Sequence, residues 1–276
     1  MNVEDKYKKV GLVLGGGGAR SFAHLGVIDV LRENGVPIDI LVTCSGGSII
    51  GALVANNIPT DQIKNEFYNR LSRARWLLPK PSRKGLLSQR GIKKIILSLC
   101  GNIDINQCHI PLYIVATNLN KGKLHVFSKG DLSIAVSASV AFPGIYTPIE
   151  IDNQLFVDGG ILNSIPADIC RNLLGEEGVV ISLVLDGFLG QKVDKNNMFS
   201  IIYRSIYIPL FQNRKHIVKK NSDVILNIFG DFEFNFKNWR DVLSFYSKRK
   251  MEYFYQLGKE KAYENLDKIT EAIKMK

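Results

Sequence analysis

The fold is decided by a short run around one serine, Leu41-Val42-Thr43-Cys44-Ser45-Gly46-Gly47-Ser48. An apolar, strand-like segment over residues 38–42 ends there, and a helix-like apolar pattern over residues 49–55 begins within a few positions. The spacing predicts a tight strand-to-helix turn, where a nucleophile elbow is found. Gly46 and Gly47 keep one side of the turn small, whereas Thr43 stands where the usual pattern has glycine. Taken alone, the run also fits an ordinary loop.

A second run places four glycines between a strand-like and a helix-like segment, Leu12-Val13-Leu14-Gly15-Gly16-Gly17-Gly18-Ala19-Arg20. Free backbone N–H groups at the start of a helix bind anionic groups. A P-loop requires Lys-Ser or Lys-Thr after its last glycine, and Ala19-Arg20 stands there instead. A dinucleotide site requires a third glycine at Ser21 and an acidic residue near Thr43 to Ser45. An oxyanion hole for acyl transfer fits better, and dinucleotide binding is disfavoured.

The third run lies far downstream and reads Phe156-Val157-Asp158-Gly159-Gly160-Ile161-Leu162-Asn163-Ser164-Ile165-Pro166. Asp158 follows a strand-like stretch over residues 154–157. The two glycines that follow it would let the carboxylate reach across a site without intervening side chains. Taken singly, an Asp-Gly turn is the simpler interpretation.

Together the three runs resemble the patatin-like phospholipase family in their order and separation. Further matches to the family pattern are Phe22-Ala23-His24-Leu25-Gly26-Val27, Ala116-Thr117-Asn118-Leu119, Ser137-Ala138-Ser139-Val140-Ala141-Phe142-Pro143-Gly144 and Asn163 to Pro166. The resemblance covers residues 9 to 230. Thr43 and Ser21 depart from the pattern, which has glycine at both positions. The first departure bears on catalysis, because a β-branched side chain would crowd a strained turn.

The resemblance implies a bacterial-type serine–aspartate dyad hydrolase that cleaves lipid acyl esters, a serine esterase of the phospholipase A or lysophospholipase type. The substrate would be a phospholipid or lysophospholipid, with no cofactor and no metal. In this mapping Ser45 is the nucleophile and Asp158 the base. The oxyanion donors are Gly16, Gly17 and Gly18, and the supporting motif residues are Arg20, Gly47, Gly159 and Gly160.

Two alternatives to this enzyme stay open. The first is a catalytically weak lipid- or acyl-binding protein on the same scaffold, with turnover impaired by Thr43. The second is a Ser-Asp-His triad, which needs a histidine after Asp158. Only His216 meets that condition, and it lies in a basic, helix-like stretch far from the three runs. The triad is therefore disfavoured.

Strand and helix patterns alternate along the chain and predict an α/β fold, a three-layer sandwich with a mainly parallel central sheet. We expect strands at residues 9–14, 38–42, 112–117, 123–127, 154–157, 179–185 and 224–228. We expect helices at residues 19–34, 46–56, 60–71, 88–100, 132–140, 166–174, 201–220 and 248–274. Residues 1–276 form one predicted domain, with residues 72–87 as a basic cap or lid and residues 230–276 as a helical C-terminal extension.

The composition favours a cytoplasmic enzyme that contacts membranes peripherally, on their inner face. Four cysteines lack metal-binding spacing, the N-terminus lacks a secretory signal, and no apolar run approaches the length of a spanning helix. The net charge is +10, and nine cations with no acidic residue lie between Glu66 and Asp104, around Trp76 to Pro79. A second acid-free stretch covers residues 195–221.

Basic residues interleaved with Trp and Leu suit an anionic membrane, where each cation contributes about 1 kcal/mol. A solvated basic face is the plain alternative. No nucleic-acid partner is expected, because no helix-turn-helix, zinc finger or single-strand stacking pattern occurs in the sequence.

Overall fold

The computed structural model describes residues 7–72, 87, 89–185, 198–230 and 247–274. Its centre is an eight-stranded sheet in the order β5-β6-β3-β2-β1-β7-β8, with β4 paired to β3 off this path. The strands are β1 (Val10–Leu14), β2 (Ile40–Cys44), β3 (Leu112–Asn118), β4 (Lys123–Phe127), β5 (Ile149–Ile151), β6 (Gln154–Asp158), β7 (Val179–Val184) and β8 (Val224–Asn227).

The middle of the sheet is parallel and one side is antiparallel. The pairs β3–β2, β2–β1, β1–β7 and β7–β8 are parallel. The β4 and β6 strands each pair antiparallel to β3, and β5 pairs antiparallel to β6. The central strands are apolar at nearly every position, as expected for strands covered on both faces. The predicted α/β fold with a mainly parallel sheet is confirmed.

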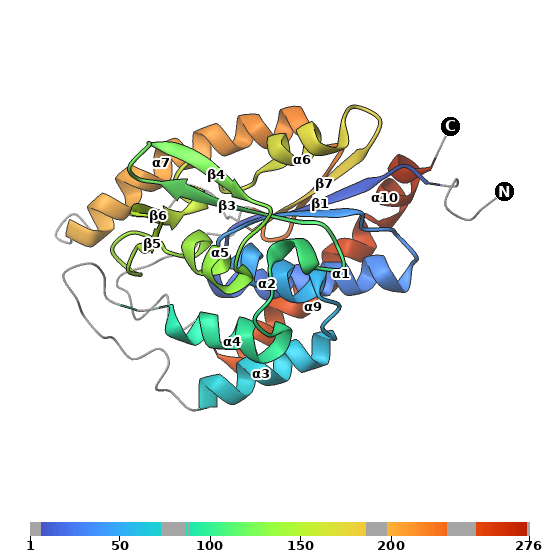
Figure 1. Ribbon diagram of the computed structural model, residues 1–276. Helices are drawn as coiled ribbons and strands as arrows, with labels where there is room; N and C mark the ends of the chain where they lie inside the picture. Colours follow the sequence, from blue (N-terminus) through green and yellow to red (C-terminus); the bar gives the residue numbers. More distant parts are fainter. Residues whose placement is uncertain (1–6, 73–86, 88, 186–197, 231–246, 275–276) are drawn as a thin grey trace.

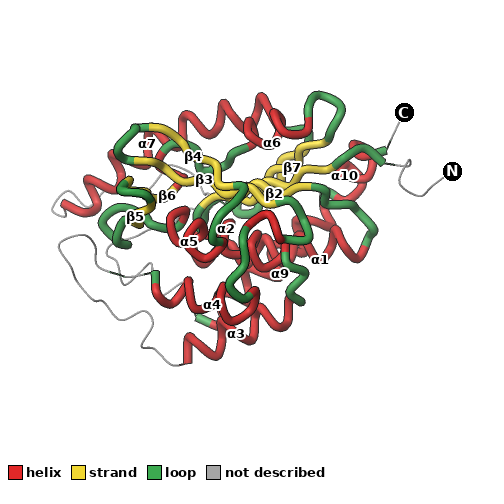
Figure 2. The backbone as a smooth tube through the Cα atoms, in the orientation of Figure 1, coloured by secondary structure: helices red, strands yellow, loops and turns green. Residues whose placement is uncertain are grey.

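Helices cover both faces of the sheet (Figures 1 and 2). One face carries α6 and α7, and the other carries α1, α2, α5 and α9, with α3 and α4 farther out (Figure 1). The helices are α1 (Phe22–Glu33), α2 (Gly46–Ala55), α3 (Thr60–Ser72), α4 (Arg90–Cys100), α5 (Leu132–Ser139), α6 (Ala167–Leu174), α7 (Met198–Asn221), α9 (Lys248–Glu264) and α10 (Leu266–Ile273), with 3₁₀ turns η2 (Gly18–Ser21), η4 (Ile105–Gln107) and η5 (Gly159–Ile161).

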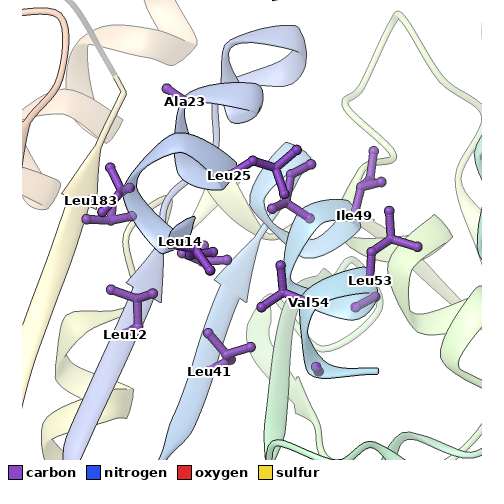
Figure 3. Packing of buried hydrophobic residues seen from close by; sticks show 14 of the residues in the cluster. Leu12, Leu14, Ala23, Leu25, Leu41, Ile49, Leu53, Val54 and Leu183 are labelled. Carbon is purple, nitrogen blue, oxygen red and sulfur yellow. The ribbon is translucent and has the colours of Figure 1, made fainter. Parts of the chain in front are cut away.

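The main core lies between the sheet and the layer of α1 and α2 (Figure 3). Leu12, Leu14 and Leu41 from the strands pack there against Leu25 and Leu53 from the helices, and all five are fully buried. The motif-bearing ends of β1 and β2 are therefore held by the main hydrophobic core.

The C-terminal region predicted as an extension packs closely on the core through α9. The backbones of α1 and α9 meet at two glycines. A Cβ at Gly26 would lie 2.1 Å from the Tyr255 carbonyl oxygen, and one at Gly258 would lie 2.0 Å from that of Ala23. Glycine is needed at both positions, since any side chain would force the helices apart.

The structure corrects several predicted boundaries. The helix predicted over residues 248–274 is two helices that divide at Asn265. The helix predicted from residue 19 begins instead as the 3₁₀ turn η2, and the short strand β5 was not predicted. The α7 helix starts at Met198 and contains Pro209.

The predicted basic cap lies largely outside the described residues, which lack 73–86 and 88. Among the helices that are described, none is both long enough and apolar enough to cross a bilayer.

Candidate active site

Ser45 lies in a strained turn between β2 and α2. Its backbone angles are φ 52° and ψ −127°, a combination that non-glycine residues seldom adopt. Such conformations cost about 1–3 kcal/mol and persist only where neighbouring groups fix them. The surroundings of Ser45 therefore hold it in this strained conformation, as the sequence pattern of a nucleophile elbow predicts.

Hydrogen bonds through the hydroxyl groups of Ser139 and Ser48 fix this turn to the neighbouring elements. Ser139, the last residue of α5, donates its hydroxyl to the Val115 carbonyl oxygen at 2.7 Å. Its oxygen accepts the Ser45 N–H at 2.9 Å and lies 2.8 Å from Ser48 Oγ. Because the Ser139 proton is used on Val115, Ser48 is the donor to Ser139. Ser45 is thus anchored to β3 through one buried side chain.

The structure brings Ser45 and Asp158 together. Ser45 Oγ donates to Asp158 Oδ2 at 2.6 Å, and Asp158 is the last residue of β6 and only 2% exposed. The other carboxylate oxygen, Oδ1, accepts the Gly160 N–H at 2.8 Å and lies 4.0 Å from Cys44 Sγ. The carboxylate therefore has one oxygen held by the protein and the other directed at the serine.

The backbone of Asp158 is fixed to β3 as well. Thr117 Oγ1 donates to the Asp158 carbonyl oxygen at 3.0 Å, and Asp158 pairs in register with Ala116. On the same edge of β3, opposite the edge that pairs with β4, Val115 pairs in register with Cys44, the residue before Ser45. Neighbouring residues of one strand thus position both partners.

The glycine loop lies beside the serine, and its predicted donors are not equivalent. A Cβ at Gly16 would lie 3.3 Å from Ser45 Cβ, so the loop and the elbow are in contact. The Gly16 N–H, however, donates to the Ser164 carbonyl oxygen at 2.9 Å. Within the described residues, the N–H groups of Gly17 and Gly18 have no hydrogen-bond acceptor.

Arg20 holds the loop in this orientation. Its Nε donates to the Gly17 carbonyl oxygen at 3.1 Å and its Nη1 to that of Leu185 at 2.8 Å. In a trans peptide the carbonyl oxygen and the following N–H point in opposite directions. By binding the Gly17 oxygen, Arg20 directs the Gly18 N–H the other way. A Cβ at Gly46 would lie 2.8 Å from that nitrogen, so Gly18 lies against the elbow.

The remaining motif glycines allow close backbone contacts. A Cβ at Gly47 would lie 2.2 Å from the Leu14 carbonyl oxygen, and one at Gly159 would lie 2.4 Å from that of Val115. Gly160 supplies the N–H that binds Asp158. The supporting motif residues are thus placed around Ser45 and Asp158.

Thr43 does not crowd the turn in the way its sequence position suggests. The nearest atoms to a Cβ at Gly47 belong to the backbone of Leu14 and Gly15. The Thr43 methyl instead points at Gly51, one turn along α2, where a Cβ would lie 2.4 Å from Thr43 Cγ2. The Thr43 hydroxyl lies 3.2 Å from Ser48 Oγ and 3.3 Å from the Tyr113 carbonyl oxygen. The expected crowding is relieved because Gly51 leaves room for the methyl.

The histidines take no part in the site as described. His24 is fully buried, with Nε2 2.9 Å from the Gly15 carbonyl oxygen. Burial lowers the pKa of His24 from 6.5 to about 4, although the bond to Gly15 raises it. His216 is exposed on α7, and no hydrogen bond among the described residues joins a histidine to Ser45 or Asp158. That same part of the chain contains no cluster of His, Cys, Asp and Glu that could hold a metal ion.

Sequence reasoning assigned no role to Ser139, Ser48 or Cys44. Ser139 belongs to a run that matches the family pattern, and this was the only signal that could have identified it. Its role depends on how α5 packs on β3, which no local pattern reveals.

Comparison with known proteins gives a family match and several relatives. The family model described as Patatin-like phospholipase matches residues 12–171. An uncharacterised NTE-family protein of Mycobacterium tuberculosis is 36% identical over 177 residues, which cover 63% of this chain and 49% of the relative. Lysophospholipase NTE1 of Coccidioides immitis is 37% identical over 168 residues, which cover 57% of this chain and 10% of the relative.

Among solved structures, VipD from Legionella pneumophila has a TM-score of 0.44 and 15% identity, covering 92% of this chain and 67% of that chain. The chain thus spans about half the length of the mycobacterial relative and a tenth of the fungal one.

Proposed function

Because the chain belongs to the patatin-like phospholipase family, we propose that it hydrolyses acyl esters of lipids with Ser45 as nucleophile and Asp158 as base. The observation that carries the proposal is the 2.6 Å hydrogen bond from Ser45 Oγ to a buried carboxylate oxygen. A nucleophile and its base must lie within this reach for proton transfer to accompany attack.

In the first half of the reaction, Ser45 Oγ attacks the acyl carbonyl carbon while its proton passes to Asp158 Oδ2. The tetrahedral intermediate collapses, the ester C–O bond breaks, and the leaving alkoxide takes the proton from Asp158. In the second half, Asp158 removes a proton from water, which attacks the acyl-enzyme. The Ser45 oxygen then leaves with that proton, and a free carboxylic acid is released.

The developing oxyanion is bound by the N–H groups of Gly17 and Gly18. We leave Gly16 out of the set, since its N–H is donated to Ser164. The start of α2 at Gly46 adds the positive end of a helix dipole beside Ser45. Arg20 acts as a positioning residue, because it binds the Gly17 carbonyl oxygen and not the substrate.

A phospholipid or lysophospholipid is the proposed substrate, and the name of the fungal relative, a lysophospholipase, supports this class. We propose that the chain forms a single catalytic domain, acts in the cytoplasm, and reaches its substrate by peripheral contact with an anionic membrane. The net charge of +10 supports such contact. The space that Gly51 leaves for Thr43 supports an enzyme over a weakly active lipid-binding protein.

The test is a panel of phospholipids, lysophospholipids, triacylglycerols and short nitrophenyl esters, with fluorophosphonate labelling of the serine. Ser45→Ala should abolish hydrolysis and labelling, and Asp158→Asn should lower turnover by several orders of magnitude. Circular dichroism checks that both variants fold. His216→Ala serves as the control and should retain full activity on a soluble nitrophenyl ester.

Labelling that persists in Ser45→Ala, or activity lost in His216→Ala, would contradict the dyad. Lipid binding by the wild-type protein without turnover of any ester would support the binding protein instead.

A further inference from the structure

The solvent-exposed stripe of α7 changes character halfway along the helix. At helical spacing, the exposed positions that the structure describes in the first half are Met198, Ile201, Ile202, Ser205, Ile208 and Pro209. On the same stripe, the exposed positions in the second half are Gln212, Asn213, Lys215, His216, Lys219 and Lys220. Five of the first six residues are apolar, and all of the second six are polar or basic.

The apolar half of this stripe is unusually open to solvent. Met198 is 65% exposed, Ile202 is 48% exposed, and Ile201 and Ile208 are each 44% exposed. These are four of the nine large apolar side chains found exposed among the described residues. Isolated apolar residues on a surface need no explanation, but a contiguous row marks a contact surface.

The stripe lies beside the candidate active site. Asn213 Nδ2 donates to the Leu162 carbonyl oxygen at 3.3 Å, and Leu162 follows the turn η5 that begins directly after Asp158. Leu162 is itself 36% exposed. In Figure 1, α7 runs along one face of the molecule with its first turns extending to the left edge of the view, past β6.

We infer that α7 docks on an anionic lipid bilayer, with the stripe from Met198 to Pro209 entering the acyl boundary and the exposed lysines of the second half at the phosphates. The inference rests on the proposed function, since it concerns how the enzyme reaches its lipid substrate. A bilayer presents an apolar layer beneath an anionic one, so it complements both halves of the stripe together. A second copy of this chain would complement only the apolar half.

The charge pattern supports this choice of partner. Residues 198–221 contain no Asp or Glu, and Lys215, Lys219 and Lys220 lie on the exposed stripe. Each cation near an anionic surface contributes to binding, and the contribution decays over a Debye length of about 8 Å at physiological salt. Docking should therefore require anionic lipid and weaken as salt is added.

The experiment measures co-sedimentation with vesicles of phosphatidylcholine alone or with phosphatidylglycerol. Binding is measured in the Ser45→Ala background, so that the vesicles stay intact. The test variant combines Ile201→Glu and Ile202→Glu, and the matched control is Leu173→Glu. Leu173 is an equally exposed aliphatic residue near the C-terminal end of α6, beside the residues that pack on Gly11 at the start of β1.

We expect the double variant to bind anionic vesicles at least about 25-fold more weakly, because two half-exposed isoleucines no longer enter the acyl boundary. The Leu173→Glu control should bind as the parent does. With Ser45 restored, the double variant should hydrolyse a soluble nitrophenyl ester at the normal rate while losing activity on vesicles.

Unchanged vesicle binding by the double variant would overturn the inference, as would equal binding to neutral and anionic vesicles. A wild-type dimer that the double variant dissociates in gel filtration would also overturn it, because a second copy would then be the partner. Absence of soluble-ester hydrolysis in the wild-type protein would instead refute the proposed function.

Discussion

Replacing Gly51 with alanine tests how the elbow accommodates Thr43. Within a helix, alanine normally stabilises by about 1 kcal/mol relative to glycine. Here the new methyl would lie 2.4 Å from Thr43 Cγ2, well inside the contact distance of two carbon atoms. Overpacking of this kind costs about 1–3 kcal/mol. We therefore expect Gly51→Ala to lower the free energy of unfolding by up to about 2 kcal/mol, despite the helix gain.

The sign of the effect should reverse in a Thr43→Ser background. Serine retains the hydroxyl that lies 3.2 Å from Ser48 Oγ and removes Cγ2. The nearest remaining atom, the Cβ at position 43, would lie 3.4 Å from the alanine methyl, which is ordinary contact. Gly51→Ala should then stabilise the protein by about 1 kcal/mol through helix propensity alone.

Urea unfolding of the wild-type protein, both single variants and the double variant gives a complete thermodynamic cycle. We expect a coupling free energy of about 1–3 kcal/mol between the two positions. Turnover of a soluble ester should fall in Gly51→Ala, because the displaced Thr43 adjoins Ser45, and should recover in the double variant. Effects that add within about 0.5 kcal/mol would refute the proposed contact.

Two further predictions concern Arg20 and His24. Arg20→Met removes the bonds that orient the Gly17–Gly18 peptide, so we expect kcat on a soluble ester to fall about 10- to 100-fold with KM little changed. A folded variant with normal kcat would contradict this role.

Burial lowers the pKa of His24 from 6.5 to about 4, so the unfolded chain binds the proton first as the pH falls. The wild-type protein should lose about 3 kcal/mol of stability between pH 6.5 and 4, whereas His24→Gln should lack this component. Parallel plots of unfolding free energy against pH for the two proteins would contradict it.

The fold could be anticipated because local patterns encode it, whereas the pairing of Ser45 with Asp158 was implied by the resemblance to the patatin-like phospholipase family. Strand-to-glycine-to-helix runs fix where β1 and β2 end, and parallel strands bring those ends to one edge of the sheet. Ser139 could not be assigned a role, because its contacts join α5 to β3 across the fold. The direction of the Thr43 methyl could not be predicted for a similar reason. The Thr43 methyl has room because Gly51, which lies beyond the elbow motif in α2, has no side chain.

The sequence pattern did not predict the helix break at Asn265 or the strand β5, and the reasons differ. The apolar pattern of residues 248–274 continues across Asn265, so periodicity alone predicts one helix. The β5 strand has only three residues and is formed by pairing with β6. Its sequence is too short to carry a period of its own.

Both members of the proposed dyad are positioned by one strand, β3, and this determines where the chain tolerates a change in length. Cys44 pairs with Val115 and Asp158 pairs with Ala116, so a single peptide unit of β3 spaces the two ladders. Loops that connect these strands are free to gain or lose residues over evolution, because their length does not enter that spacing. One residue inserted within β3 would instead shift Ser45 relative to Asp158 by about 3.3 Å, which would break the hydrogen bond between them. New substrate-selecting segments are therefore expected as insertions outside residues 112–118.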